Sequence, residues 1–140
     1  MKLEQNKALV RAYMMNQVLS KGDPAALKRY FSEDVVFNNS GEVGPQLARM
    51  RALRNAFPDL HLTIEDQIAE ADKVVTRVTF RGTHRGEFGG IAPTGNPVEY
   101  SGIAIDRIAD GKVVEMWHLA NLPALLQQIG APPAPAPGNK

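Results

Sequence analysis

The chain has 140 residues, of which 44% are hydrophobic and 22% are charged, and its formal net charge is +1. This length suits one domain, and this composition allows a continuous core. Because basic and acidic residues are spread along the chain, the charge pattern predicts neither a nucleic-acid nor a membrane partner. Cysteine is absent from the sequence, which excludes disulfides, thiolate nucleophiles and cysteine-bound zinc.

The N-terminal segment does not have the pattern expected of a targeting signal. Glu4, Asn6, Lys7 and Arg11 interrupt its apolar residues. A secretory signal requires an unbroken apolar region, and a membrane span requires a longer one. We therefore expect a cytoplasmic protein.

Apolar residues recur at helical spacing in three segments of the first half of the chain. Residues 3–19 form the first predicted helix. A short second helix follows Asp23-Pro24, an N-cap followed by a proline in the first turn. Residues 34–38 are predicted to be a strand, and a third helix begins near Gly44-Pro45 and ends before Pro58.

In the second half the apolar residues recur every two positions, which is typical of strands. Two strands are predicted over residues 60–68 and 74–81, and a hairpin over 98–108 and 112–121 is closed by Asp110-Gly111. A short helix over residues 122–129 follows.

Helices followed by antiparallel strands favour an α+β fold with the helices on one face of the sheet. Residues 1–130 form the single predicted domain. Residues 131–140 are rich in proline and alanine and are predicted to be a disordered tail.

Four motifs carry a family resemblance. They are FPDL at residues 57–60, GTHRGEFGGIAPTG at 82–95, DGKVVEMW at 110–117 and LLQQIG at 125–130. In kind and spacing they resemble the motifs of the SnoaL-like polyketide and ester cyclases of the NTF2-like superfamily. The resemblance extends from about Asn6 to Gly130.

The resemblance implies an NTF2-like cone, in which a curved antiparallel sheet and the N-terminal helices enclose a hydrophobic pocket. The best-characterised members close a polyketide ring by intramolecular aldol condensation without a metal or an organic cofactor. We therefore expect no cofactor, a small hydrophobic molecule as the ligand, and a homodimer or higher homo-oligomer formed through the outer face of the sheet.

The sequence departs from the family at the residues that handle the proton. The family aspartate just after the tryptophan of the last strand is replaced by His118, and a second aspartate by Asn121. The histidine partner on the preceding strand corresponds to Ala104. The aspartate–histidine pair of the family is therefore not carried over.

His118 is the predicted general acid/base, because a neutral imidazole can deprotonate a carbon next to a carbonyl group. Strand alternation places Val114, Met116, His118 and Ala120 on one face, which we expect to line the cavity. The alternative is a core histidine that hydrogen-bonds to the backbone or to water.

Asn121 is the second predicted catalytic residue, and Tyr13, Asn38, Met116 and Trp117 are the predicted substrate contacts. Helix capping for Asn121, turn formation for Asn38, and packing for Tyr13 and Trp117 are the structural alternatives. His84 is expected to be structural and His61 to be solvated. The sequence has no metal-binding pattern of histidines and carboxylates.

Three functions remain open. The first is a cofactor-independent acid/base enzyme acting on a small hydrophobic carbonyl compound, as a cyclase or a related isomerase or lyase. The second is a non-catalytic protein that binds a hydrophobic ligand. The third, epoxide hydrolysis of the limonene type, needs an Asp–Arg–Asp set, and the adjacent Asp106 and Arg107 point to opposite faces of a strand.

Overall fold

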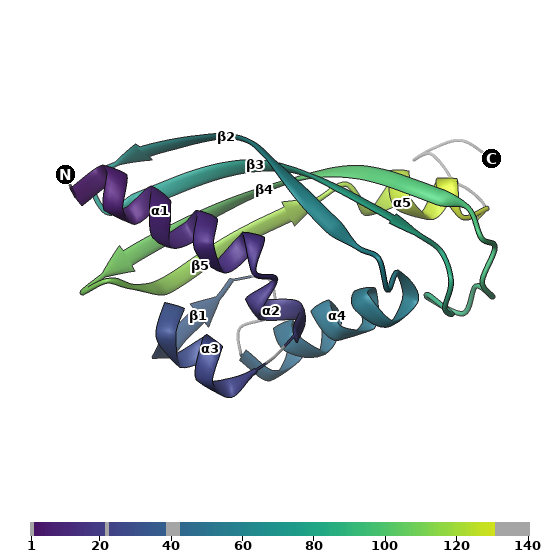
Figure 1. Ribbon diagram of the computed structural model, residues 1–140, viewed down its shortest axis with the longest axis horizontal. Helices are drawn as coiled ribbons and strands as arrows, with labels where there is room; N and C mark the ends of the chain where they lie inside the picture. Colours follow the sequence, from purple (N-terminus) through teal and green to yellow (C-terminus); the bar gives the residue numbers. More distant parts are fainter. Residues whose placement is uncertain (1, 22, 39–42, 131–140) are drawn as a thin grey trace, which may run out of the picture.

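A computed structural model of the chain describes residues 2–21, 23–38 and 43–130. The predicted tail at 131–140 lies outside these residues. Five helices and five strands make up the described chain (Figure 1). The helices are α1 (Lys2–Met15), α2 (Val18–Lys21), α3 (Pro24–Tyr30), α4 (Val43–Ala56) and α5 (Leu122–Gln128). The strands are β1 (Phe31–Phe37), β2 (His61–Glu70), β3 (Lys73–Thr83), β4 (Pro97–Ala109) and β5 (Lys112–Ala120).

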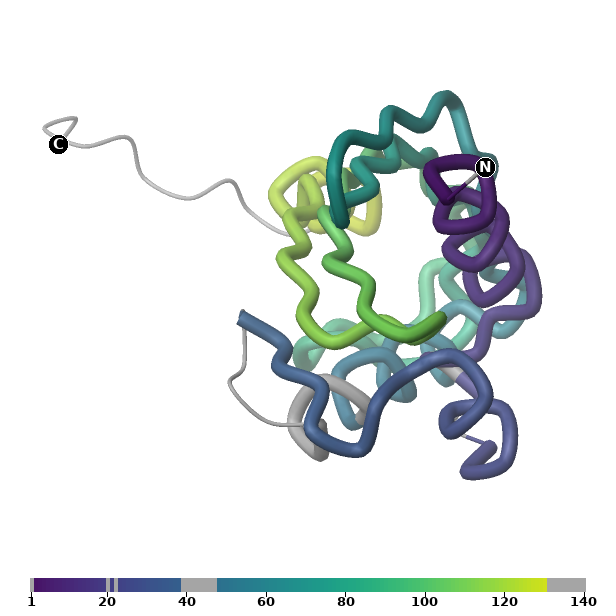
Figure 2. Tube along the Cα trace, turned by 90° about the vertical axis from the view of Figure 1, so that its left-hand side faces the viewer, coloured from purple at the N-terminus to yellow at the C-terminus, as the bar shows by residue number. Residues whose placement is uncertain are grey.

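The strands form one sheet in the order β1-β5-β4-β3-β2. Helix α1 lies across one face of this sheet, and α5 packs at the opposite end (Figure 1). Viewed along the sheet, the chain curls so that α1 faces the β4–β5 hairpin across the interior (Figure 2). This is the α+β NTF2-like cone that the resemblance implies.

Alternation of buried and exposed residues builds the concave face. On β3 every second residue is buried, as the period of two predicts: Val74, Thr76, Val78, Phe80 and Gly82. On β4 every second residue from Val98 to Ile108 is buried. Register shifts interrupt the ladders between Ile64 and Asp66 on β2 and between Arg107 and Ile108 on β4. Such bulges increase the twist of a sheet and help it to curve.

The β4–β5 hairpin closes through the predicted Asp110-Gly111 turn. Both residues have positive φ, 51° for Asp110 and 75° for Gly111. Type I′ turns, which match the twist of paired strands, require this conformation at both central positions. The hairpin prediction is confirmed.

The first predicted helix is broken in the structure. Helix α1 ends at Met15 and α2 begins at Val18, because Gln17 adopts a left-handed φ of 52° that a continuous helix does not allow. The Asn16 side chain donates a hydrogen bond of 2.9 Å to the Ala12 carbonyl at this end. The break turns α2 toward α4 and brings Gln17 to the edge of the interior.

The sheet is mixed and not purely antiparallel. Strand β1 pairs in parallel with β5, while the other three pairs are antiparallel. A parallel pair requires a long crossover, and everything from α4 to β4 lies between these two strands in the sequence. Sequence periodicity reports the faces of a strand and not its neighbour, so this pairing was not predicted.

The glycine- and proline-rich segment between β3 and β4 is pinned by His84, as expected for a structural histidine. His84 is fully buried, and its ring lies 5.4 Å from the ring of Phe57, centre to centre. The Thr94 backbone N–H donates to His84 Nδ1 over 3.2 Å.

Among the described residues, no helix has the length and apolar character that a membrane crossing requires.

Candidate functional site

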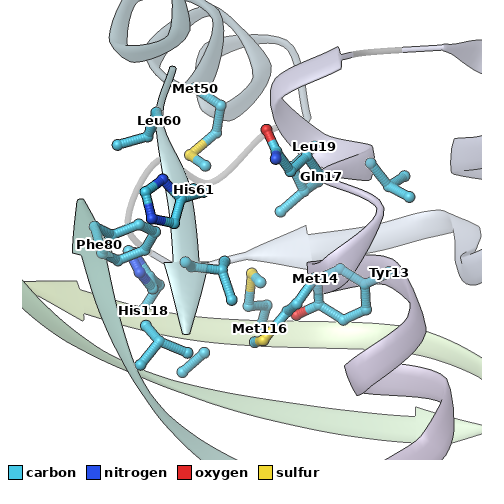
Figure 3. Close-up of a pocket in the computed structure, with 14 residues that line it drawn as sticks. Tyr13, Met14, Gln17, Leu19, Met50, Leu60, His61, Phe80, Met116 and His118 are labelled. Atoms are coloured by element: carbon cyan, nitrogen blue, oxygen red, sulfur yellow. The ribbon is translucent and has the colours of Figure 1, made fainter. Parts of the chain in front are cut away.

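An apolar pocket lies between the helices and the concave face of the sheet (Figure 3). Its cavity volume is about 70 Å³. Side chains from α1, α2, α4 and four strands form the walls, and they are Tyr13, Met14, Gln17, Val18, Leu19, Met50, Leu60, His61, Leu62, Val78, Phe80, Ala104, Met116 and His118. Three of these residues are methionines, whose side chains are flexible and polarizable.

His118 reaches this pocket from β5, together with Met116. Its ring meets the edge or face of Phe80 at 89°, with ring centres 6.3 Å apart. Burial among apolar side chains lowers the pKa of His118 from its ordinary value of 6.5, because it disfavours the charged imidazolium. At neutral pH the imidazole is therefore neutral and able to accept a proton.

Small residues on β4 make room for the His118 ring. Ala104 is the residue opposite His118 in the β4–β5 ladder. Gly102 is the next inward position, where a Cβ would lie 3.5 Å from His118 Nε2 and 2.9 Å from Phe80 Cε2. An added Cβ at position 102 would clash with Phe80 but only touch His118, so the glycine keeps room for the Phe80 ring that packs against His118.

The strand face predicted for β5 is correct at Met116 and His118 but not at Val114. Val113 is fully buried, whereas Val114 is half-buried and lies in a register shift of the β4–β5 ladder. The extra residue of a bulge interrupts the alternation of faces. Val113 therefore takes the inward place that a regular strand would give to Val114.

A buried pair connects α1 to β4 behind the pocket wall. The Tyr13 hydroxyl donates a hydrogen bond of 2.8 Å to Asp106 Oδ1. Asp106 is fully buried, and burial raises the pKa of its carboxyl group from 3.8 to about 7, although the hydrogen bond from Tyr13 opposes the shift. Burial and the neighbouring Asp106 raise the pKa of Tyr13 well above 10.0.

Three of the predicted site residues lie outside the pocket lining. Asn38 is exposed and holds β1 to β5, because its amide donates to Glu115 Oε2 over 3.1 Å and to the Met116 carbonyl over 3.2 Å. The Asn121 side chain accepts the Ala124 N–H over 3.2 Å and caps α5. Trp117 lies between Met116 and His118 on β5 and so faces the other side of the sheet.

His61 and Asp106 are the site residues that sequence reasoning did not select. His61 is exposed, as predicted, but it also lines the pocket, and its Nδ1 lies 3.1 Å from the Asp59 carbonyl oxygen. A signal for Asp106 was present, since alternation on β4 places it on the same face as Ala104 and Ile108. A carboxylate on an otherwise apolar strand face is the pattern to look for.

The residues needed for two other chemistries are not assembled. Asp106 is buried inside, whereas the Arg107 side chain pairs with Glu115 across 3.1 Å on the outer face, so the two do not share a water as limonene-type epoxide hydrolysis requires. Within the described residues, no group of three or more histidine, aspartate or glutamate side chains is arranged to hold a metal ion.

Comparisons with known proteins agree with this architecture. The sequence model of the SnoaL-like polyketide cyclase family matches residues 9–129. No curated protein matched the chain. AclR from Streptomyces galilaeus, a candidate hydroxylase, has 32% sequence identity and a TM-score of 0.79, with 96% of this chain and 90% of AclR covered.

Two further solved structures are similar over most of their length. IdmH from Streptomyces antibioticus, a candidate polyketide cyclase, has 27% identity and a TM-score of 0.77, covering 91% of this chain and 99% of IdmH. A candidate SnoaL-like polyketide cyclase from Jannaschia sp. CCS1 has 25% identity and a TM-score of 0.79. The match covers 93% of this chain and 94% of the Jannaschia protein. Because the family model matches residues 9–129 and the solved structures share the fold over most of the chain, the chain belongs to the SnoaL-like polyketide cyclase family.

Proposed function

We propose that the chain is a cofactor-independent acid/base enzyme that acts on a small hydrophobic carbonyl compound, as an intramolecular aldol cyclase or a related isomerase or lyase. The observation that carries this proposal is the position of His118. Its imidazole lines an apolar pocket, and burial keeps the pKa below 6.5. A neutral imidazole enclosed by apolar side chains is suited to accept a proton from a carbon acid.

In the proposed reaction, His118 carries out both proton transfers. The imidazole takes a proton from the carbon next to a ligand carbonyl, which leaves an enolate and an imidazolium. The enolate carbon then attacks a second carbonyl carbon of the same molecule and forms the new carbon–carbon bond. The imidazolium returns its proton to the resulting alkoxide, so that no external acid, base or oxidant is consumed.

The pocket walls support an apolar ligand. Most of the lining is aliphatic or aromatic: Phe80 lies beside His118, Met116 comes from the same strand as His118, and Met14 and Met50 come from the helices. The Gln17 amide oxygen accepts a hydrogen bond from Arg54 of α4, so this contact ties the helix break to the neighbouring helix at the pocket edge. A charged ligand would lose its hydration here without gaining a described counter-ion in the lining.

Proton exchange on a model ketone tests the proposal without knowledge of the natural substrate. The probe is 2-tetralone, an apolar bicyclic ketone with acidic hydrogens next to the carbonyl. We expect the protein to catalyse exchange of these hydrogens in D₂O, followed by proton NMR. His118→Gln should reduce the rate at least about 100-fold, the contribution typical of a general base.

Two further variants serve as controls for the assignment of the base. Arg77→Gln changes an exposed ion pair with Asp66 on the outer face, and it should retain the wild-type exchange rate. His61→Gln removes the other histidine of the pocket lining. Exchange that persists in His118→Gln, or that is lost with His61 instead, would show that His118 is not the base.

The alternative is a protein that holds a hydrophobic ligand without reacting with it. The apolar lining favours this alternative, and so does Asn121, whose side chain caps α5 and does not line the pocket. Binding of 2-tetralone without any catalysed exchange would support it. Since AclR is a candidate hydroxylase, uptake of dioxygen during incubation with a ketone is the readout for a third possibility.

We also propose that the protein is a homodimer that assembles through the outer face of β4 and β5 and acts in the cytoplasm. Ile103 and Leu119 are opposite each other in the ladder and are 47% and 75% exposed. Next to them, Ile105 is opposite Trp117. Contiguous apolar residues on an exposed sheet face are typical of an interface between subunits. On β3, by contrast, Arg77, Thr79 and Arg81 make the outer face polar.

A further inference from the structure

The Tyr13–Asp106 pair is not used by the chemistry assigned to His118. Tyr13 connects the pocket to this pair, because it lines the pocket and its hydroxyl group donates a hydrogen bond to Asp106. Asp106 itself does not line the pocket. Any effect of the carboxyl group on a ligand must therefore pass through the Tyr13 hydroxyl.

Among the described residues, Tyr13 is the one polar side chain that hydrogen-bonds to Asp106. Its neighbours across the ladder are Val74 on β3 and Met116 on β5, and neither titrates. Asp106 Oδ2 is buried and has no hydrogen-bond partner among the described residues. A buried carboxylate with one donor is poorly compensated, which favours the neutral acid.

Several charged side chains on the elements around the pair have partners other than Tyr13 and Asp106. On α1, Lys7 pairs with Glu4 at 3.7 Å, and Arg11 donates to Gln67 Oε1 of β2. The ion pairs of Arg77 with Asp66 and of Arg107 with Glu115 lie on the outer face of the sheet. Tyr13 is therefore the ionisable group that contacts Asp106 within the described part of the chain.

The direction of the hydrogen bond depends on the protonation of Asp106. When the carboxyl group is ionised, it can only accept, so the Tyr13 proton points at Oδ1. When the carboxyl group is neutral and carries its proton on the oxygen nearest Tyr13, it donates to the phenol oxygen. The phenol proton is then free to turn toward a ligand, and the hydrogen bond that it receives makes it a stronger donor.

We propose that Tyr13, poised by protonated Asp106, is a binding subsite for the carbonyl or enolate oxygen of the ligand. Tyr13 touches the ligand, and Asp106 is a positioning residue that acts through it. The subsite rests on the proposed function only in that the base His118 would generate the enolate; binding of a carbonyl oxygen does not require that step. A preorganised donor aimed at a developing oxyanion is a large contribution to catalysis of this kind.

Infrared spectroscopy of the carbonyl group in bound 2-tetralone tests the subsite directly. The C=O stretch moves to lower wavenumber when the oxygen accepts a hydrogen bond. We expect the bound ketone to show this shift at about pH 5.5, where Asp106 is neutral, and to lose most of it at about pH 8.5, where Asp106 is ionised. The ketone itself does not titrate in this range, so the change reports on the protein.

Two variants separate the subsite from a structural role of the pair. Tyr13→Phe keeps the ring, which packs at 4.8 Å from Phe31, and should lose the shift at every pH and weaken binding about tenfold. Asp106→Asn cannot ionise and should make the shift independent of pH. Tyr30→Phe removes the hydroxyl of a tyrosine outside the pocket and is the matched control, with the wild-type shift and affinity.

The outcome is decisive and independent of the test of His118. Equal shifts and affinities in the wild type and Tyr13→Phe would overturn the subsite, as would a pH-dependent shift that survives in Asp106→Asn. His118→Gln should lose exchange and yet retain the pH step in the carbonyl stretch. If His118→Gln instead keeps full exchange, the proposed base fails while the infrared result for Tyr13 stands on its own.

Discussion

Tyr13 and Asp106 are 93 positions apart in the sequence, and a hydrogen bond of 2.8 Å joins them inside the fold. The contact ties α1 to the middle of β4, and it places a carboxyl group and a phenol in an interior that is otherwise mostly apolar. Each group shifts the pKa of the other, so we expect the pair to make the stability of the fold depend on pH.

The first prediction concerns stability and Asp106. Since the folded-state pKa is raised from 3.8 to about 7, the folded protein holds a proton that the unfolded chain releases between these values. Stability therefore falls as the pH rises through this window and levels off above it, by a few kcal/mol at most, on the order of 1.4 kcal/mol per pH unit.

Urea unfolding at several pH values measures this slope. In Asp106→Asn the contribution should vanish, so the variant should gain stability relative to the wild type as the pH rises from about 5 to about 8. Asp66→Asn, which alters an exposed carboxylate on the outer face, is the control and should leave the slope unchanged. Parallel pH profiles for the wild type and Asp106→Asn would contradict a raised pKa.

The second prediction concerns His118, whose pKa is lowered by burial. The linkage has the opposite sign, because the unfolded chain binds a proton below pH 6.5 that the folded protein resists. The free energy of unfolding should therefore fall as the pH drops below 6.5, because the buried imidazole resists protonation. His118→Gln should remove this loss. NMR of the imidazole Cε1–H signal should show a midpoint below the ordinary value; a midpoint at or above it would contradict the burial argument.

The third prediction is that Gly102→Ala impairs the site through crowding. The added Cβ would lie 2.9 Å from Phe80 Cε2 and 3.3 Å from the Leu119 carbonyl oxygen, so the Phe80 ring must shift. Because this ring packs against His118, the shift would alter the surroundings of the imidazole. We expect a loss of about 1–3 kcal/mol in the free energy of unfolding, which is typical of overpacking.

Gly102→Ala should also slow 2-tetralone exchange by more than its folded fraction explains. Ser101→Ala, at the neighbouring exposed position of β4, is the matched control. Wild-type exchange in a folded Gly102→Ala variant would show that the space beside Nε2 is not needed.

The fourth prediction concerns the proposed dimer. A charge on the apolar patch should separate the subunits, because a buried unpaired charge opposes association. Leu119→Glu and Ile103→Glu should sediment as monomers in analytical ultracentrifugation, whereas Ile68→Glu, at an exposed apolar residue on β2, should sediment as the wild type does. A wild-type protein that is already monomeric at high concentration would remove the proposal.

Much of the fold could be predicted because local chemistry decides it. The Asp110-Gly111 turn favours positive φ at both positions, and the structure has it there. The period of two on β3 set its buried face correctly, and the family motifs indicated the cone before any contact was known. The position of His118 in the pocket followed from the same alternation, because a regular strand transmits its faces from residue to residue.

Tertiary contacts decided the rest. The break at Gln17, the parallel β1–β5 pair and the bulge at Val114 depend on partners far along the chain, which a local period does not report. The same limit applies to the site that opened this section. The sequence by itself predicted Tyr13 as a substrate contact and placed the side chains of Asp106 and Arg107 on opposite faces of a strand. Only the folded chain brings the phenol of Tyr13 to the carboxyl group of Asp106. Burial then removes the water that would hold the carboxylate in its ordinary state, and that desolvation makes the pair a candidate for chemistry.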